Sequence, residues 1–283
     1  MTSLLHLSDV HFGPPHRPEV AEGVLALIEE RRPQVVVLSG DLTQRAKPEQ
    51  FRQARRFVER IPVPTLTVPG NHDVPLYRFW ERIFAPFAAY RQNFSPDLEP
   101  VLELDGVAIV GVNTAHGWTL KDGRISLRRL ERLADQIAGL PAETYKIVVA
   151  HHQLIPPPGF GSQRVLVNAH ETLEVLARSG VDLVLSGHLH QAYTATSEEY
   201  FRLGLRPVRI LHSGTSTSSR GRGPERRLNT CNWIRFDEAT VSVSHLQWHP
   251  EIGRFEERSR HFFGRPEDAS LDPSDVDCSV ARP

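Results

Sequence analysis

Five short apolar runs in the sequence are each followed by residues that bind metals or move protons. The runs LLHLS, VVVLSG, TLTVPG, KIVVA and VDLVLSG have the composition of buried β-strands. The residues that follow them are Asp9 with His11, Asp41, Asn71 with His72 and Asp73, His151, and His188 with His190. Ligands of open α/β sheets bind beyond the carboxyl ends of the strands, so we expect these side chains to converge on one site.

The residue types in this set predict a metal centre. Asp9, Asp41 and Asn71 offer oxygen ligands, four histidines offer imidazole nitrogens, and the set contains no thiolate. The histidines are His11, His151, His188 and His190. Oxygen and imidazole ligands suit Mn, Fe or Zn. Seven ligands exceed the four that one zinc ion takes, and they fit two ions roughly 3.5–4 Å apart that share a bridging carboxylate.

The spacing of these residues suggests how the backbone aims them. Asp9 and His11 are two residues apart, as are His188 and His190, and in extended chain this spacing sends both side chains to one side. Glycine precedes Asp41, Asn71 and His188, and we expect it to let the backbone turn sharply into the site.

Two kinds of segment must position these loops. Through residue 190, apolar runs alternate with helical stretches at residues 18–32, 47–61, 77–94, 126–140 and 169–180, which predicts βαβ units. Beyond that point RPVRILHSG, TCNWIRFD and TVSVSHLQWH read as strands without helices between them. The sequence therefore predicts one α/β domain over residues 1–264, and residues 265–283, polar and rich in proline, as a loose tail.

Composition narrows the partners. A net charge of −1 and a pI near 6.9 provide no overall field toward nucleic acid or an anionic membrane, so we expect neither partner. No apolar window approaches the length that crosses a bilayer, and no secretory leader is visible. Cys231 and Cys278 match no disulfide or zinc spacing. We expect a cytoplasmic protein.

The blocks DVH, GDLT, GNHD, AHHQ and GHLH, in this order, resemble the motif set of calcineurin-like metallophosphoesterases. The resemblance spans residues 9–190 and implies a four-layer α/β/β/α sandwich, in which two mixed sheets are flanked by helices. By position, it implies a first metal held by Asp9, His11, Asp41 and His190. It implies a second metal held by Asp41, which bridges, and by Asn71, His151 and His188.

The resemblance also assigns roles near the substrate. His72 matches the histidine that contacts the phosphate and the leaving-group oxygen, and we predict it as the catalytic residue; Asn71 and His72 are the predicted substrate-binding pair. His151 occupies the ligand position of its block, and His152 is predicted to line the site or to orient a neighbour. Asp73 is predicted to hydrogen-bond nearby loops or to orient His72.

Within the superfamily, DVHFG, GDLT and the paired histidines resemble class III cyclic nucleotide phosphodiesterases. This implies hydrolysis of phosphate diesters, 3′,5′-cyclic nucleotides among them, by attack of a hydroxide that bridges two metal ions. The ions would be divalent or trivalent, Mn and/or Fe, with Zn as an alternative. The implied partner is a small phosphate ester, and a homodimer is compatible with the resemblance.

Other functions remain open. Prolines straight after the paired histidines are common in class III enzymes, but here they are delayed to residues 156–158, where substrate-contacting loops are expected. A phosphomonoesterase or a nuclease of the same superfamily is the alternative, although a nuclease would need a basic groove. A non-catalytic metal-binding scaffold would have lost ligands, whereas all seven positions are filled. The segment GRGPERR, residues 221–227, is either a solvated loop or a lid that contacts phosphate.

Overall fold

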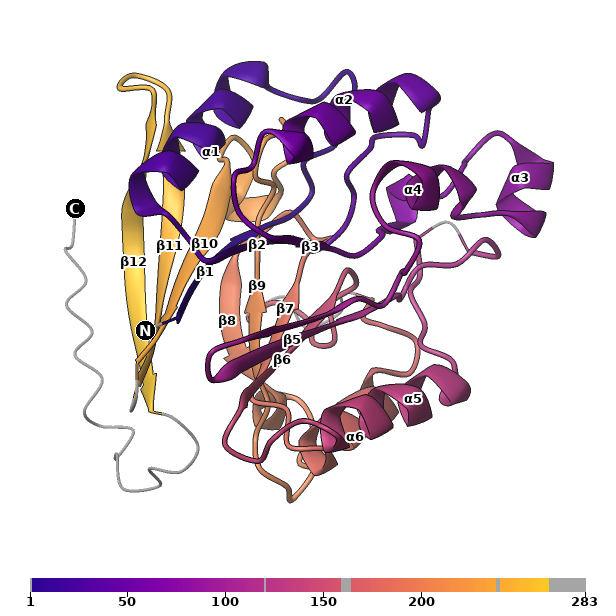
Figure 1. Ribbon diagram of the computed structural model, residues 1–283, viewed down its shortest axis with the longest axis vertical. Helices are drawn as coiled ribbons and strands as arrows, with labels where there is room; N and C mark the ends of the chain where they lie inside the picture. The colour runs from indigo at the N-terminus through magenta and orange to yellow at the C-terminus, as the bar shows by residue number, and fades with distance from the viewer. Residues whose placement is uncertain (1, 120, 159–163, 238–239, 265–283) are drawn as a thin grey trace.

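The computed structural model describes residues 2–119, 121–158, 164–237 and 240–264. Two six-stranded mixed sheets face each other, and helices cover the outer face of each (Figure 1). The predicted four-layer α/β/β/α sandwich is therefore confirmed. The predicted tail, residues 265–283, lies outside the described residues, so the domain boundary stays a prediction.

The first sheet combines parallel and antiparallel strands. Its strands are β1 (Thr2–Leu7), β2 (Val35–Leu38), β3 (Thr65–Thr67), β10 (Thr230–Phe236), β11 (Thr240–His249) and β12 (Arg254–Gly264). Their spatial order is β12-β11-β10-β1-β2-β3, with β1, β2 and β3 mutually parallel and the remaining pairs antiparallel. Helices α1 (Pro18–Arg31) and α2 (Pro48–Glu59) pack on its outer face (Figure 1).

The second sheet repeats this plan. Its strands are β4 (Val101–Leu104), β5 (Val107–Val112), β6 (Tyr145–Ala150), β7 (Leu183–Ser186), β8 (Tyr193–Thr196) and β9 (Arg209–His212). Their order is β4-β5-β6-β7-β9-β8; the four inner strands are parallel, and the two edge strands pair antiparallel. Helices α5 (Leu127–Ala138) and α6 (Ala169–Arg178) cover its outer face.

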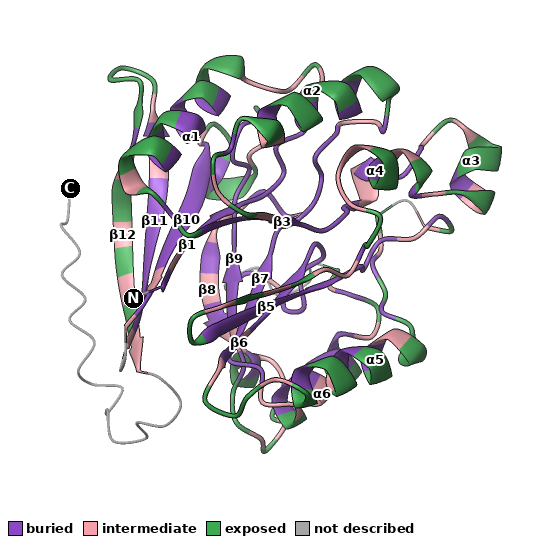
Figure 2. Cartoon of the chain, viewed as in Figure 1, coloured by how far each residue is buried: buried purple, intermediate pink, exposed green. Residues whose placement is uncertain are grey.

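The inner parallel strands β2, β5, β6 and β7 are apolar and buried on both faces because helices cover one face and the other sheet covers the opposite face (Figure 2). Leu4 and Val37 of the first sheet and Ile147 and Leu185 of the second are fully buried in the core between the sheets. This rigid double layer fixes where each parallel strand ends. The loops that leave β1, β2, β3, β6 and β7 can therefore hold side chains in set positions.

The helices are amphipathic in the way that their outer positions require. In α2, Phe51, Ala54 and Phe57 recur every three residues and are buried against the sheet. Arg52 and Arg55, between them, face solvent and pair with glutamates of the same helix. Burial of the apolar stripe, rather than these exposed pairs, holds the helix to the sheet.

The structure corrects one predicted helix and adds two strands that the sequence did not predict. Residues 77–94 do not form a single helical stretch: α3 (Phe79–Phe84) and α4 (Ala88–Asn93) are separated around Pro86, which disfavours helix for the preceding residue. Strands β8 and β12 were not anticipated. β12 is an edge strand whose many charged residues conceal a strand pattern.

No helix within the described residues is long and apolar enough to span a bilayer.

Candidate metal centre

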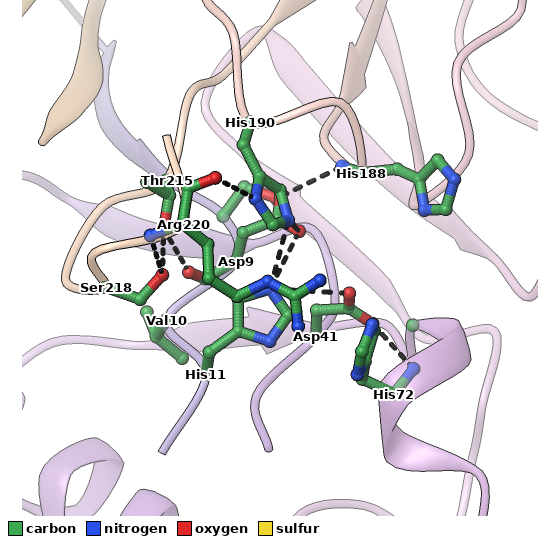
Figure 3. Close-up of polar contacts among 12 residues, drawn as sticks. Asp9, Val10, His11, Asp41, His72, His188, His190, Thr215, Ser218 and Arg220 are labelled. Carbon is green, nitrogen blue, oxygen red and sulfur yellow. Dashed lines mark hydrogen bonds and ion pairs between the residues drawn. The ribbon is translucent and has the colours of Figure 1, made fainter. Parts of the chain in front are cut away.

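The predicted ligands lie where the loops after five parallel strands converge. Figure 3 shows five of them, Asp9, His11, Asp41, His188 and His190. The loop after β1 supplies Asp9 and His11, and the loop after β2 supplies Asp41. A single turn of 3₁₀ helix after β3 (Asn71–Asp73) begins with a predicted ligand. The ends of β6 and β7 supply the remaining histidines. Seven side chains that are far apart in sequence are thus gathered at one edge of the sandwich.

Asp9, His11, Asp41 and His190 form a first cluster, in which one ligand atom from each lies within 4.8 Å of the others. Asp9 Oδ1 is 3.0 Å from His190 Nε2 and 3.5 Å from His11 Nε2. Asp41 Oδ2 is 3.6 Å from His11 Nε2. All four side chains are buried. The cluster has the composition of a mixed carboxylate and imidazole metal site.

The other oxygen of Asp41 belongs to a second cluster. Asp41 Oδ1 is 3.3 Å from His151 Nε2. The same ring nitrogen is 3.2 Å from Asn71 Oδ1 and 3.2 Å from His188 Nδ1. Asp41 therefore lies between the two clusters and turns one oxygen toward each, which is the geometry that a bridging ligand needs.

An unusual backbone conformation aims five of these side chains. Asp9, His11, Asp41, His188 and His190 all have positive φ, between 47° and 77°. This left-handed region is uncommon for residues with a Cβ atom and is concentrated at functional sites. The prediction that extended backbone would send paired residues to one side is therefore wrong in its reason. The side chains converge because left-handed backbone at alternate residues, at 9 and 11 and again at 188 and 190, turns the chain.

The glycines before the ligands serve mainly to let backbones approach closely. Gly40 has a φ of +94°, as the predicted sharp turn requires. Gly70 has an ordinary φ of −101°, but a Cβ atom there would lie 2.1 Å from Asp41 Oδ1. At Gly187 a Cβ atom would lie 1.8 Å from the Ser8 hydroxyl oxygen. The prediction of a sharp turn is thus confirmed at Gly40. At Gly70 and Gly187, glycine is required because a Cβ atom would collide with a neighbouring residue.

Hydrogen bonds fix the orientation of the histidine rings. His151 Nδ1 donates to the carbonyl oxygen of Ser39 at 2.8 Å, and His190 Nδ1 donates to that of Arg220 at 2.7 Å. Because a carbonyl only accepts, each Nδ1 carries a hydrogen, and Nε2 is the ring atom that can offer a lone pair to a metal when it carries no proton. This backbone support is the usual arrangement for metal-binding histidines.

A serine- and threonine-rich segment, residues 213–219, holds the loop that carries the first two ligands. Thr215 Oγ1 donates to the Asp9 carbonyl oxygen at 2.7 Å. Thr217 Oγ1 donates to that of Val10 at 3.0 Å. These residues were not predicted from the sequence, because their role depends on a contact between segments some 200 residues apart. They stabilise the strained backbone at the site.

Both carboxylates are ionised in this environment. Burial is the largest single influence and raises the pKa of Asp9, but His190, His11 and His151 together outweigh it and hold that pKa well below its usual range. The same balance applies to Asp41: burial raises its pKa, but the rings of His151, His72 and His11 together hold it well below its usual range. The charges suit cation binding.

The imidazoles divide into two kinds. Burial lowers the pKa of His11 to about 4 and that of His188 to about 3, so both rings are neutral near pH 7. For His151, burial lowers the pKa, but the Asp41 carboxylate more than compensates and raises it to about 9. Neutral rings are the form that ligates metal, and at His151 a metal ion would compete with a proton.

Two oxygen atoms test directly whether a cation fits. Asp9 Oδ1 and Asp41 Oδ2 are buried, and neither has a hydrogen-bond donor in the described part of the chain. Leaving a buried carboxylate oxygen without a donor is costly. Both atoms point toward the Nε2 atoms of His11 and His190, which lie only 3.1 Å apart. A cation among these four atoms would satisfy all of them, so the residues present fit a metal ion.

His72 lies beside the two clusters and faces a cavity. Its amide donates to Asp41 Oδ1 at 2.8 Å, and its Nδ1 donates to the Gln44 carbonyl oxygen at 2.7 Å. Nε2 is therefore the ring atom left for a ligand. The cavity has a volume of about 330 Å³ and is also lined by Asn71, His188 and the other residues of this edge.

Two neighbours of the predicted ligands have clear roles. Asp73 accepts hydrogen bonds from the amides of Leu42, Thr43 and Gly70, which confirms the prediction that it supports nearby loops. Burial, together with the adjacent Asp41, raises the pKa of Asp73 to about 7. It ties the loop after β2 to the loop after β3.

His152 lies nearer the second cluster than the sequence indicated. A ring nitrogen of His152 lies within 4.8 Å of ligand atoms of His151 and His188. Its Nδ1 is 2.7 Å from the Thr114 hydroxyl, and its Nε2 is buried without a hydrogen-bond partner in the described residues. The structure thus brings His152 among the ligand histidines, and it is an alternative ligand to the predicted set.

Comparisons with known proteins agree with this geometry. The family model of the calcineurin-like phosphoesterases matches residues 2–192. A probable cyclic nucleotide phosphodiesterase of Synechococcus sp. is 30% identical over 183 residues, which cover 61% of this chain and 64% of the relative. One of Rhodococcus erythropolis is 28% identical over 214 residues, covering 68% and 66%. The chain thus spans slightly less than two thirds of the length of these relatives.

A solved structure shows the same fold. The purple acid phosphatase PPD1 from yellow lupin seeds superimposes with a TM-score of 0.71 at 14% identity, covering 93% of this chain and 54% of the phosphatase. At this identity the likeness concerns the fold alone.

Proposed function

The chain belongs to the calcineurin-like phosphoesterase family, and we propose that it is a phosphodiesterase that uses two metal ions. The observation that carries the proposal is the position of Asp41, which turns one oxygen toward each cluster next to a cavity lined by His72. Asp9, His11 and His190 would complete one site with Asp41. Asn71, His151 and His188 would complete the other, with His152 as an alternative ligand.

The set of ligands fits Mn and/or Fe, with Zn as an alternative. When bound, two such ions supply an activated water as nucleophile and offset negative charge on the phosphoryl oxygens. The protein's own contribution is to hold the ligand atoms in place through the left-handed loops and to keep the imidazoles of His11 and His188 neutral.

His72 is the proposed catalytic residue of the protein. Its Nδ1 is held by the Gln44 carbonyl oxygen, which leaves Nε2 to face the cavity. We propose that Nε2–H stabilises charge on the leaving-group oxygen and protonates it, as a general acid. Burial lowers the pKa of His72, which makes its protonated ring a stronger acid. Asn71, adjacent on the same turn, would contact both metal and substrate.

Diesters are the proposed substrate class, 3′,5′-cyclic nucleotides among them. The support comes from relatives that bear the name cyclic nucleotide phosphodiesterase. A phosphomonoesterase or nuclease of the same family is the alternative, and it has support from the cations that line the cavity. A scaffold without activity is disfavoured because every ligand position is filled and oriented. Cytoplasmic location and a homodimer stay predictions.

Initial rates on two chromogenic substrates test the proposal. Metal-stripped protein is assayed with bis(p-nitrophenyl) phosphate and with p-nitrophenyl phosphate, with and without added Mn²⁺. We expect hydrolysis only with Mn²⁺ and a preference for the diester. A preference for the monoester would reassign the protein as a phosphatase.

A further inference from the structure

Five cationic side chains line the cavity in addition to the proposed metal ligands. They are Arg45, Arg82, Lys121, Arg220 and Arg222. In the described part of the chain, none of the five forms an ion pair with a carboxylate; Arg82 instead donates to the carbonyl oxygens of Pro75 and Thr119. Among the described residues, the only acidic side chain that lines this cavity is Asp41, whose charge the proposed metals would offset. The molecule carries a net charge of −1, so this basic rim is a local feature.

The backbone of residues 220–222 is tied to the centre. The Arg220 carbonyl oxygen accepts from His190 Nδ1 at 2.7 Å, and the Arg222 amide donates to the His190 carbonyl oxygen at 3.2 Å. The Arg220 guanidinium donates to Gln44 Oε1 at 2.9 Å and is half-buried. These bonds hold the backbone of residues 220–222 against a proposed metal ligand, so the side chains of Arg220 and Arg222 start beside the cavity that both of them line.

A second cavity continues from the first. It has a volume of about 430 Å³ and shares Lys121, His188 and Arg222 with the first cavity. Arg164 also lines it, 3.5 Å from Asp122, so one of its cations has a partner. Lys121 and Arg222 have no carboxylate partner among the described residues, and both line the two cavities. A ligand that spans both would pass between these two side chains.

One phosphate does not account for this arrangement. The reacting phosphoryl group would be held by the metals and by His72, and its charge would be largely offset there. Cations that line the same cavity without a carboxylate partner repel one another, and an anionic ligand between them would offset this repulsion. Arginine forks and lysine point charges together favour phosphate.

We propose that the substrate carries a second phosphate group, bound by Lys121 and Arg222 at the junction of the two cavities. This inference rests on the proposed phosphodiesterase activity and narrows its substrate class. A nucleoside with a second phosphate and an oligonucleotide both offer this chemistry. A cyclic mononucleotide, with one phosphate, does not.

Two chromogenic diesters that differ only in the presence of a second phosphate test this inference. Thymidine 5′-(p-nitrophenyl phosphate) has one phosphate, and its 3′-phosphate derivative has two. With the Mn²⁺-loaded protein, we expect the derivative to be cleaved with a kcat/KM about 10- to 100-fold higher, as charge-assisted hydrogen bonds to phosphate would give. Isothermal titration should show a matching preference for thymidine 3′,5′-bisphosphate over thymidine 5′-monophosphate.

The double variant Lys121→Gln/Arg222→Gln should bring the kcat/KM ratio of the two substrates close to one. Both side chains are exposed, so the variant should fold. Arg227→Gln, an exposed arginine of the same segment that lines neither cavity, is the matched control and should keep the ratio.

Equal kcat/KM for both substrates in the unmodified protein would overturn the inference and leave the phosphodiesterase proposal standing. An undiminished ratio in the double variant would overturn the assignment to Lys121 and Arg222. If neither substrate is cleaved, the proposed function itself fails. Extending the substrate with thymidylates at the 3′-phosphate distinguishes the two substrate types. A further rise in kcat/KM indicates an oligonucleotide substrate, and no further rise indicates a nucleoside with a second phosphate.

Discussion

Residues in the left-handed region define the chemistry of this site. Each such residue with a Cβ atom costs roughly 1–3 kcal/mol, and five of the seven proposed ligands adopt this conformation. The types of these residues could be predicted from the sequence, since Asp, Asn and His after apolar runs indicate a metal site. Their φ angles could not, because left-handed backbone remains uncommon even for Asp and His, although these residues adopt it more often than other residues with a Cβ atom. Tertiary hydrogen bonds impose it.

Asp41 is the residue on which both metal sites depend. Asp41→Ala should remove one ligand from each cluster, and we expect both ions to be lost after dialysis. Elemental analysis of the purified variant checks this. Asp135→Ala, an exposed change on α5, is the control and should retain both ions. Retention of both ions by the Asp41 variant would rule out a bridging role.

His72 should matter for turnover but not for metal content. His72→Ala removes the ring that faces the cavity and leaves the Asp41 contact, which comes from its amide. We expect the metal content to be unchanged and kcat to fall by ~10²–10⁴-fold. Steady-state rates on a diester, paired with elemental analysis, measure both. An unchanged kcat would exclude general acid catalysis by this residue.

At the scale of elements, the proposed ligands lie on the loops that follow the strands, and hydrogen bonds from other loops stabilise the conformation of these loops. The Thr215 hydroxyl donates to the carbonyl oxygen of Asp9, and the two residues are 206 positions apart in the sequence. Thr215→Val keeps the shape and removes the donor. We expect a loss of about 1 kcal/mol in the free energy of unfolding and weaker Mn²⁺ binding.

Denaturant unfolding and Mn²⁺ titration of the Thr215→Val protein measure these two effects. Thr65→Val removes a local hydrogen bond, to the carbonyl of Val63, and serves as the control. If both variants bind Mn²⁺ equally well, the segment of residues 213–219 does not support the site.

The loops after β2 and β3 lie so close to each other at Gly70 that no side chain fits there. Gly70 has an ordinary φ, so Gly70→Ala tests space without backbone strain. The new methyl group would meet Asp41 Oδ1 at 2.1 Å, and we expect loss of Mn²⁺ affinity and of activity. Gly139→Ala has room, with its nearest neighbour 3.5 Å away, and should be neutral. Normal Mn²⁺ binding by Gly70→Ala would show that the two loops can separate.

At the scale of the whole molecule, the double sheet is the part that sequence patterns predicted well. Apolar runs bounded by glycine or proline marked the parallel strands, because strands buried on both faces must be apolar. The break at Pro86 and the edge strand β12 were missed, since short helices and charged edge strands carry weak periodicity. The basic rim was missed for another reason: a net charge of −1 conceals cations that gather only in the fold.

The central claim is that two metal ions, held around Asp41, drive cleavage of a phosphate diester. The most direct measurement titrates Mn²⁺ into metal-stripped protein and follows bound ions and the rate on bis(p-nitrophenyl) phosphate together. We expect the rate to rise as Mn²⁺ binds and to level off at two ions per chain. Two bound ions without diester hydrolysis, or full hydrolysis with metal-stripped protein, would contradict the claim.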